Sequence, residues 1–446
     1  MLDQAARIRN WAEQRVTSGS RPRSRNAPDT RALSITKLAT KQSRVSGNAA
    51  LKFVLLIGVV SFFADFTYEG SRSIAGPYLA ILGASATAVG IIAGLGELLG
   101  YGLRLFSGPL SERTGKFWPV TLFGYVIQML AVPALALARS WPGAALLIIL
   151  ERVGKAIRNP PRDVMLSHAA KQMGYGWGFG LHEALDQSGA LLGPLLVAAV
   201  LSNRHSYPRA FATLLVPGLA ALAALLAARV IYPRPEDLEA APSPDVHAGG
   251  LPSIFWVYLS GAALVAAGFA DFSLIAYHFE KAGNVPKVWV PVFYSVAMGV
   301  SGAGSLVFGR LFDRFGVSVL VPLTIISALS TPLVFLGNFW LSLLGVAAWG
   351  LGMGVHESII PAAVAVMVPQ QRRGSAYGIF TAGYGVFWFL GSVAIGILYD
   401  VFLPALIVFS VVAEIAAIPV FLRVATRLAP AAREASSPEP REDARR

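Results

Sequence analysis

Cysteine is absent from the 446 residues, which excludes a disulfide framework and a metal site built on thiolates. Charged residues are also scarce, at 14%, whereas 55% of the residues are hydrophobic and the mean hydropathy is +0.58. One soluble core could not bury so large a share of apolar side chains. The composition therefore indicates a protein that crosses a membrane many times.

The sequence also lacks a recognisable nucleophile, metal-ligand or nucleotide-binding motif. The nearest candidate, the glycine-rich stretch 94–100, has one residue too many for a dinucleotide fingerprint and lies within an apolar segment. We therefore expect no enzymatic activity, no cofactor and no bound metal. The net charge of +12 could favour nucleic acid. Because the basic residues gather in the tails and in alternate loops, we interpret the charge as membrane topology and expect no nucleic-acid partner.

Short motifs recur roughly 200 residues apart. The tetrapeptide Phe-Ala-Asp-Phe at 63–66 returns at 269–272, and the loop at 108–115 returns in similar form at 309–316. This period is too long for a solenoid repeat and indicates a duplicated half. In membrane proteins, such a duplication is typical of a transporter whose substrate site lies between the halves, near the middle of the bilayer.

Twelve apolar segments are long enough to cross the hydrocarbon layer as helices. In the first half they are Leu51–Gly70, Ala86–Phe106, Trp118–Ala138, Ala144–Ala169, Gly178–Leu201 and Arg209–Ile231. In the second half they are Ile254–Phe279, Val288–Phe308, Val317–Leu336, Phe339–Val368, Ser375–Leu398 and Leu403–Val424. We predict an all-α polytopic membrane protein, with twelve transmembrane helices in two pseudo-symmetric six-helix bundles, residues 51–231 and 254–424.

The remaining segments are polar. Residues 1–50 are basic, rich in serine and without the apolar run of a secretory signal; they predict a disordered cytoplasmic tail, with an organellar transit peptide as the alternative. Residues 232–253 predict a cytoplasmic linker and residues 425–446 a second disordered tail. The distribution of Lys and Arg places both termini in the cytoplasm. We expect a monomer that crosses the cell membrane several times, in a bacterial inner membrane.

Three motifs resemble those of the major facilitator superfamily. The loop at 108–116 resembles its cytoplasmic Gly-x-Leu-x-Asp-Arg-x-Gly-Arg/Lys signature, with Glu112 in place of the usual Asp. Arg152 resembles its intramembrane arginine, and Gly189–Pro194 resembles the Gly-x-x-x-Gly-Pro motif of its proton-driven exporters. The resemblance spans roughly residues 51–424 and implies a twelve-span, proton-coupled drug or metabolite transporter that works by alternating access. It leaves the substrate open, because one fold hosts many functions.

The loop signature and its repeat carry four charges at cytoplasmic helix ends: Glu112, Arg113, Asp313 and Arg314. A carboxylate there can interact with a helix amino terminus, and an arginine can bridge to a neighbouring helix. We predict a gating role for these residues, as a charge-paired latch that does not contact substrate. The alternative is that they only set the topology.

Ionisable residues inside spans are costly and mark functional sites. Asp65 and Glu69 lie one turn apart on the first span, and two carboxylates so close favour a proton on one of them. His182, Glu183 and Asp186 lie within about one turn on the fifth span, where histidine can change partners when it takes up a proton. We predict proton coupling for all five residues. The alternatives are structural ion pairs and a gating role for the fifth-span group.

The fourth span carries Arg152 and Lys155, which either bind an anionic substrate group or pair with acids on the first and fifth spans. In the second half the aligned positions are largely uncharged, and Asp271, Tyr384 and Trp388 provide polar and aromatic surface. We predict that these five residues bind substrate. Aromatic side chains in such helices also pack against neighbouring helices or lie at the membrane interface.

The expected function is secondary active transport, as proton-coupled export of a small organic or amphiphilic compound. The first alternative is proton-coupled uptake of an anionic metabolite, which would suit the basic residues of the fourth span. A second alternative is a sensor or lipid-handling protein with a transporter fold. The expected partners are a small-molecule substrate, protons as the coupling ion, and the lipid bilayer.

Overall fold

The computed structural model describes residues 30–107, 114–173, 175–203, 206–234, 251–356, 360–368 and 373–435. Every regular element in these ranges is a helix. Residues 1–48 form a unit of their own, and the residues from Ala49 onward form one compact unit. The twelve predicted spans lie in this compact unit.

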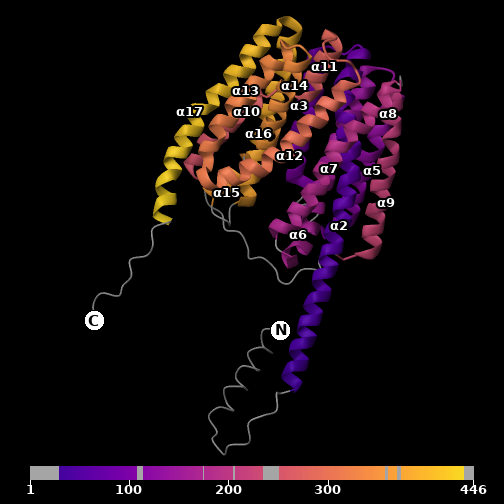
Figure 1. Cartoon of the computed structure of the whole chain (residues 1–446), viewed down its shortest axis with the longest axis vertical. Helices are drawn as coiled ribbons and strands as arrows, with labels where there is room; N and C mark the ends of the chain where they lie inside the picture. The colour runs from indigo at the N-terminus through magenta and orange to yellow at the C-terminus, as the bar shows by residue number, and fades with distance from the viewer. Residues whose placement is uncertain are drawn as a thin grey trace, which may run out of the picture. The chain divides into compact units, whose positions relative to one another are not determined.

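The chain order of the main helices is shown in Figure 1. The first half contains α2 (Thr30–Ile81), α3 (Ala86–Gly102), α5 (Phe117–Ala134), α6 (Trp141–Met173), α7 (Tyr175–Ser202), α8 (Tyr207–Thr213) and α9 (Leu215–Ile231). The second half contains α10 (Ser253–Gly268), α11 (Phe272–Ala282), α12 (Trp289–Phe315), α13 (Leu320–Phe335), α14 (Phe339–Gly354), α15 (Ile360–Met367), α16 (Arg373–Val401) and α17 (Leu403–Ala435).

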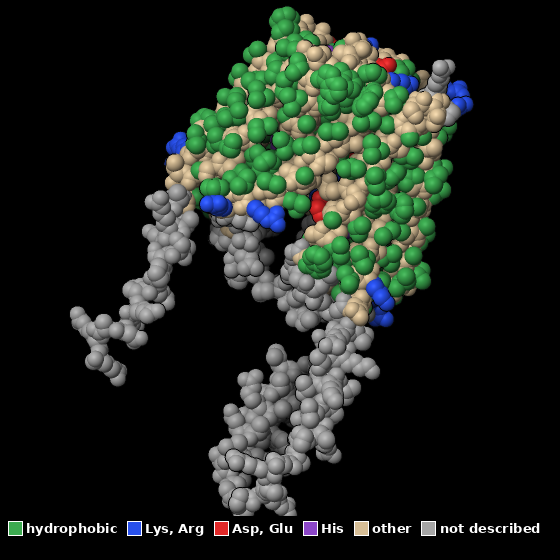
Figure 2. Space-filling model, in the orientation of Figure 1, with side chains coloured by type: hydrophobic (Ala, Val, Ile, Leu, Met, Phe, Trp, Pro, Cys, Tyr) green, Lys and Arg blue, Asp and Glu red, His purple; other side chains and the backbone are tan. Residues whose placement is uncertain are grey.

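Ten helical segments in the described ranges are long and apolar enough to cross a membrane. Figure 2 shows apolar side chains over most of the visible flank, with Lys and Arg near its edges. The predicted fourth and tenth spans are not among the ten, because α6 is highly charged and α14 has only 16 residues. The all-helical membrane fold is confirmed, whereas the count of twelve and the division into two bundles stay predictions.

Helices of the two halves pack most extensively against each other where α3 lies along α16 and α7 lies along α12. At the first, a Cβ atom on Gly90 would come within 2.3 Å of the carbonyl oxygen of Ser392. No side chain fits there, so glycine is what lets the two backbones approach. The contact between the halves therefore depends on the glycine-rich sequence of α3.

The glycines of the Gly189–Pro194 motif have a similar effect within the first half. Cβ atoms on Gly189 and Gly193 would come within 2.2 and 2.1 Å of the carbonyl oxygens of Phe62 and Phe66 on α2. These close approaches flank Asp65 in the sequence. The motif therefore holds α7 directly against the part of α2 that carries this carboxylate.

The predicted seventh span, residues 254–279, is interrupted. Helix α10 ends at Gly268, and Phe269 is extended (φ −77°, ψ 114°). Helix α11 then starts at an N-cap formed by Asp271, whose Oδ1 accepts a hydrogen bond from the backbone N–H of Ser273 at 3.2 Å. The sequence pattern predicts one helix here, because the apolar run continues through the break.

Side chains from other helices satisfy the backbone at this break. The carbonyl of Gly268 accepts a hydrogen bond from Ser410 Oγ at 2.6 Å, and that of Ala270 accepts one from Trp349 Nε1 at 2.8 Å. Non-helical backbone inside a membrane protein requires such partners. The interruption is thus built into the packing of the second half.

Hydrogen bonds join the two halves at the end where α3 begins. Asp400 accepts from the backbone N–H groups of Ala86 and Thr87, at 3.1 and 2.8 Å, and Tyr277 donates to the carbonyl of Ala84 at 3.0 Å. We call this region the linked end; it comprises Ala84, Ala86, Thr87, Tyr207, Tyr277, Glu280 and Asp400. Any motion that separates the halves at this end must break these bonds.

Candidate functional site

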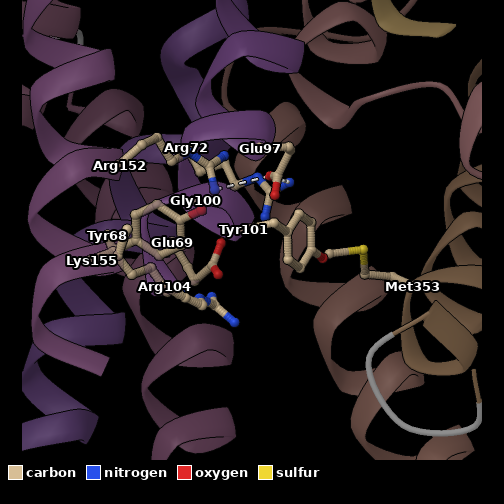
Figure 3. A pocket seen from close by; sticks show the side chains of 11 residues that line it. Tyr68, Glu69, Arg72, Glu97, Gly100, Tyr101, Arg104, Arg152, Lys155 and Met353 are labelled. Carbon is tan, nitrogen blue, oxygen red and sulfur yellow. Dashed lines mark hydrogen bonds and ion pairs between the residues drawn. The ribbon is translucent and has the colours of Figure 1, made fainter. Parts of the chain in front are cut away.

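A cavity of 70 Å³ lies among α2, α3 and α6. Its lining consists of Tyr68, Glu69, Arg72, Glu97, Gly100, Tyr101, Arg104, Arg152, Lys155, Ala156 and Met353. In Figure 3 the charged side chains gather on one side and Met353, from α14, lies on the opposite side. Four basic side chains face two carboxylates in this lining. Three further carboxylates just outside it, Asp65, Asp271 and Glu151, pair with Lys155, Arg72 and Arg152.

Glu97 is held by two arginines. Its Oε1 atom lies 3.0 Å from a terminal nitrogen of Arg152 and 3.3 Å from one of Arg72 (Figure 3). Arg104 follows Glu97 by seven residues in the predicted second span, a spacing that predicts a pair on one helical face. Instead, the Arg104 guanidinium lies 5.4 Å from the ring centre of Tyr101, and its buried Nε atom has no hydrogen-bond partner in the described ranges.

Lys155 lies between the cavity and Asp65. Its ammonium nitrogen is 3.9 Å from the ring centre of Tyr68 and also 3.9 Å from Oδ2 of Asp65. The guanidinium carbon of Arg152 lies 5.0 Å from the same ring. The electron-rich face of a tyrosine stabilises cations, so Tyr68 helps to hold two positive charges at the cavity wall.

Asp65 itself lies behind the cavity lining and is 6% exposed. Its Oδ1 atom is 3.3 Å from the guanidinium of Arg158, a side chain that is fully buried. Arg158 also donates hydrogen bonds to Gln128, at 2.5 Å, and to the hydroxyl of Tyr125, at 2.8 Å. Lys155 thus pairs with an acid of the first span, one of the two arrangements predicted for it, whereas Arg152 pairs with Glu97 of the second span.

Two polar contacts connect the cavity region to the second half. The hydroxyl of Tyr294 on α12 donates a short hydrogen bond to Glu69, and Arg72 lies 3.9 Å from Asp271. Within α2, the described ion pairs involve Asp65 and Arg72. Glu69 forms none of these ion pairs. Its contact with the second half is the hydrogen bond that it accepts from the neutral hydroxyl of Tyr294.

The three residues of the predicted fifth-span group have different surroundings. His182 is buried, and its Nε2 atom lies 2.7 Å from Ser61 Oγ. Glu183 is exposed and accepts a hydrogen bond from Gln187 at 3.0 Å. Asp186 is half-buried, with one oxygen buried and unpartnered among the described residues. Proton coupling by these three residues stays a prediction.

The predicted substrate residues of the second half lie outside the cavity lining. Tyr384 and Trp388 are buried in an aromatic cluster around His356, and the Tyr384 hydroxyl is 2.6 Å from His356 Nδ1. The ring centre of Tyr384 is 5.9 Å from that of Tyr101, which does line the cavity. Asp271 instead caps the start of α11. Binding of substrate by these three residues stays a prediction, as it does for Arg152 and Lys155 in the lining.

The predicted latch falls mostly outside the described residues. Glu112 and Arg113 lie in the gap after residue 107, and the side chain of Asp313 is likewise not described. Arg314 is exposed, with its guanidinium 5.1 Å from the ring centre of Phe315. The gating role of these residues stays a prediction.

Several polar residues of the interior were not singled out from the sequence. Tyr68 could have been found, because it shares the helix face of Asp65 and Arg72 at i+3 and i−4. Glu414 is an acid within an apolar span, which is itself a signal. Tyr294 offers no local signal, since a tyrosine in a span most often packs or lies at the interface.

One family model and several relatives match this chain. The family model of the Major Facilitator Superfamily matches residues 55–329 and 289–445. An uncharacterized protein of Mycobacterium tuberculosis is 42% identical over 376 residues, which cover 83% of this chain and 92% of the relative. The multidrug resistance protein MdtH of Edwardsiella ictaluri is 29% identical over 170 residues, 37% of this chain and 40% of its own.

Among solved structures, a peptide transporter of the POT type in complex with sulfate has a TM-score of 0.66 and 14% identity. The alignment covers 85% of this chain and 94% of the transporter. Identity this low supports the fold and carries no information on substrate.

Proposed function

Because the chain belongs to the Major Facilitator Superfamily and is thus a membrane transporter rather than an enzyme, we propose that it carries a small organic anion together with protons. The observation that supports the anion is the charge of the cavity, where Arg72, Arg104, Arg152 and Lys155 face Glu69 and Glu97. Arg72, Arg152 and Lys155 each have a carboxylate partner, whereas Arg104 forms no ion pair with any described residue. An unpaired cation inside a membrane protein is costly, and an anion bound at Arg104 would remove that cost.

The individual basic groups differ in their availability. Arg72 and Arg152 share Glu97, whereas Arg104 stacks on Tyr101 with a buried, unpartnered Nε among the described residues. A guanidinium presents paired N–H donors that match the two oxygens of a carboxylate or phosphate. Arg104 and Arg152 are therefore the proposed anchors of the anionic group.

The size of the cavity favours a small ligand group. Its 70 Å³ is far below the roughly 300 Å³ at the lower end for pockets that enclose drug-sized molecules. It holds a carboxylate or phosphate group with a few water molecules. This supports the anionic metabolite, the first alternative from the sequence, over an amphiphilic drug.

Lys155 provides the proposed link between anion and proton. Its ammonium group lies 3.9 Å from Asp65 and also lines the cavity. A proton on Asp65 releases Lys155 toward the anion, and an anion that attracts Lys155 makes Asp65 easier to protonate. Since such coupling is reciprocal, proton and anion bind together and move in the same direction.

Glu69 is the second proposed proton carrier. As a carboxylate it accepts the hydrogen bond from Tyr294 of the second half; protonation weakens that bond and with it one connection between the halves. The substrate then reaches the cavity from the end opposite the linked end. In this proposal the protein works as a monomer, with both termini in the cytoplasm.

Export of an amphiphilic compound is the second candidate. It is favoured by the similarity to multidrug resistance proteins, which covers about a third of the chain, and by the exporter-like glycine motif of α7. It differs from the first candidate in two measurable properties, the charge of the substrate and the direction of the proton.

Proton flux in proteoliposomes with an internal pH dye tests the proposal. Small carboxylates and phosphate esters are compared with organic cations and neutral drugs. We expect internal acidification on adding an anion, lost in Arg152→Ala and kept in the control Arg229→Ala, which removes an exposed arginine outside the cavity. Proton movement driven by cations or neutral drugs would contradict the anion and favour export.

A further inference from the structure

Glu414 on α17 is an acidic side chain with no role in the proposed transport cycle. It is 0% exposed and lies near the middle of the candidate span Leu403–Leu428. Among the described residues, Ser327 of α13 is its one hydrogen-bonding neighbour, in a geometry too loose to satisfy either carboxyl oxygen, and no basic side chain acts on it. An ionised carboxylate in such surroundings would be an uncompensated charge at low dielectric. The group is therefore stable in this environment when it is neutralised, either by protonation or by a cation bound beside it.

A second unpartnered group lies beside this carboxyl. Ser327 on α13 interacts with Glu414, is 2% exposed, and its Oγ atom also lacks a hydrogen-bond partner in the described part of the chain. Two buried oxygen-bearing side chains from different helices thus face each other in a loose contact. Buried polar groups normally have well-formed partners, so the contact fits either a proton shared between the two groups or a cation held between their oxygens.

The third wall is the carboxyl-terminal end of α10. A Cβ atom on Gly268 would come within 3.0 Å of Glu414 Cγ, so the acid lies directly against that backbone. On helix α16, the titratable side chain that interacts electrostatically with Glu414 is Tyr384. Its hydroxyl is hydrogen-bonded to His356. Among the described residues, α10 and α13 present glycine and serine, and no cation balances the carboxylate.

We propose that Glu414 and Ser327 form a binding site for a monovalent cation, a proton or Na⁺, separate from the cavity among α2, α3 and α6. A proton from water converts the carboxylate to a neutral acid that can donate a hydrogen bond to Ser327. Na⁺ would instead be held by the carboxylate and hydroxyl oxygens. In both cases the site is electrically neutral when occupied.

Occupancy of this site acts on the break between α10 and α11. The carboxyl-terminal end of a helix carries partial negative charge, so an ionised Glu414 repels the end of α10, whereas a neutralised one does not. The segment after this end carries Asp271, which lies 3.9 Å from Arg72. The cation site therefore connects the second half to the charged cavity of the first.

Infrared spectroscopy of the purified full-length protein in nanodiscs tests the site without a substrate. Spectra of the wild type and Glu414→Gln are compared near neutral pH and at alkaline pH, in sodium chloride and in choline chloride. If the cation is a proton, the wild type shows the C=O stretch of a buried protonated carboxyl, absent from the variant in both salts. If it is Na⁺, that band appears only in choline, and sodium raises the melting temperature of the wild type but not of the variant.

Two further variants sharpen the result. Ser327→Ala removes the hydroxyl partner and should shift the pH at which the band disappears by about one unit. Glu280→Gln removes a carboxyl that already accepts a hydrogen bond from Tyr207 and should leave the band unchanged. If Glu414→Gln fails to fold, Glu414→Asp is used instead. It keeps a carboxyl group in the site and must shift the wavenumber of the C=O stretch. Identical spectra and identical sodium dependence in wild type and Glu414 variants would overturn the site, whether or not anion transport is found.

Discussion

The two halves share a sequence repeat but bury different chemistry. The first half places arginines, a lysine and carboxylates around its cavity, whereas the corresponding part of the second half holds aromatic rings around His356. In the repeat, Arg152 aligns with Gly350, where a Cβ atom would come within 2.4 Å of the Ala297 carbonyl oxygen. An arginine cannot occupy that position. The close approach of two backbones in the second half thus leaves no room for a counterpart of Arg152.

Among the predicted variants, Arg152→Ala should have the largest effect, because it removes a buried charge from the first half. Arg152→Ala leaves the buried Glu97 with one partner fewer and takes a positive charge from the cavity. We expect the affinity for the transported anion to fall by roughly 100-fold, since loss of one member of a buried charge pair costs about 2–5 kcal/mol. Isothermal titration gives the dissociation constants, with Arg229→Ala as the control. Equal losses in both variants would mean that cavity charge is not what binds the anion.

Asp65→Asn should separate proton from anion movement. The neutral amide no longer attracts Lys155, so the anion binds and exchanges while the proton gradient no longer drives its accumulation. We expect accumulation at least about tenfold lower, the effect of a lost coupling free energy of about 1.4 kcal/mol. Radiolabelled uptake under an imposed pH gradient, compared with exchange at equal pH, measures both. Wild-type accumulation by a well-folded variant would remove Asp65 as a carrier.

Paired glycine substitutions compare close packing in the two halves. Gly193→Ala and Gly350→Ala each force a methyl group against a backbone carbonyl, and overpacking of this kind costs about 1–3 kcal/mol. Both should lower the melting temperature. Only Gly193→Ala should also weaken proton coupling, because Gly193 lies against α2 beside Asp65. An equal loss of proton coupling in Gly350→Ala would show that coupling is not confined to the first half.

Asp400→Ala should loosen the linked end. The variant removes the acceptor for three hydrogen bonds at the start of α3, and loss of a helix cap costs about 1 kcal/mol. We expect roughly a fivefold shift toward conformations separated at this end. The chain has no cysteine, so spin labels on Arg139→Cys and Lys281→Cys report the distance without background. An unchanged distance distribution would contradict a role in holding the halves together.

Tyr68 should give the smallest effect. Tyr68→Phe keeps the ring beneath Lys155 and Arg152 and should change anion affinity little. Tyr68→Leu removes it and should weaken the anion site by about 2- to 5-fold, corresponding to about 0.5–1 kcal/mol for a cation–π contact. Isothermal titration with the anion gives the dissociation constants of both variants. A larger loss in Tyr68→Phe would assign the effect to the hydroxyl group rather than to the ring.

The local pattern predicted the helices and the identity of the charged residues better than their partners. The i, i+4 spacing brought Asp65 and Glu69 to one face of α2, as expected, but Lys155 and Arg158 come to Asp65 from α6. Likewise, proximity along α7 grouped His182 with Glu183, whereas one is buried against Ser61 and the other is exposed. Periodicity along one helix cannot report which neighbouring helix covers each face.

Composition and repeat were sufficient for the class of protein, because an apolar chain must satisfy its backbone internally in lipid and therefore folds into helices. Sequence alone also identified Arg152, Lys155, Asp65 and Glu69 as costly charges within those helices. Only the tertiary structure decided that Glu97 joins Arg72 to Arg152, that the seventh span breaks before Asp271, and that Glu414 lacks a counter-charge among the described residues. Each of these depends on contacts between helices far apart in the chain, which hydropathy and spacing do not encode.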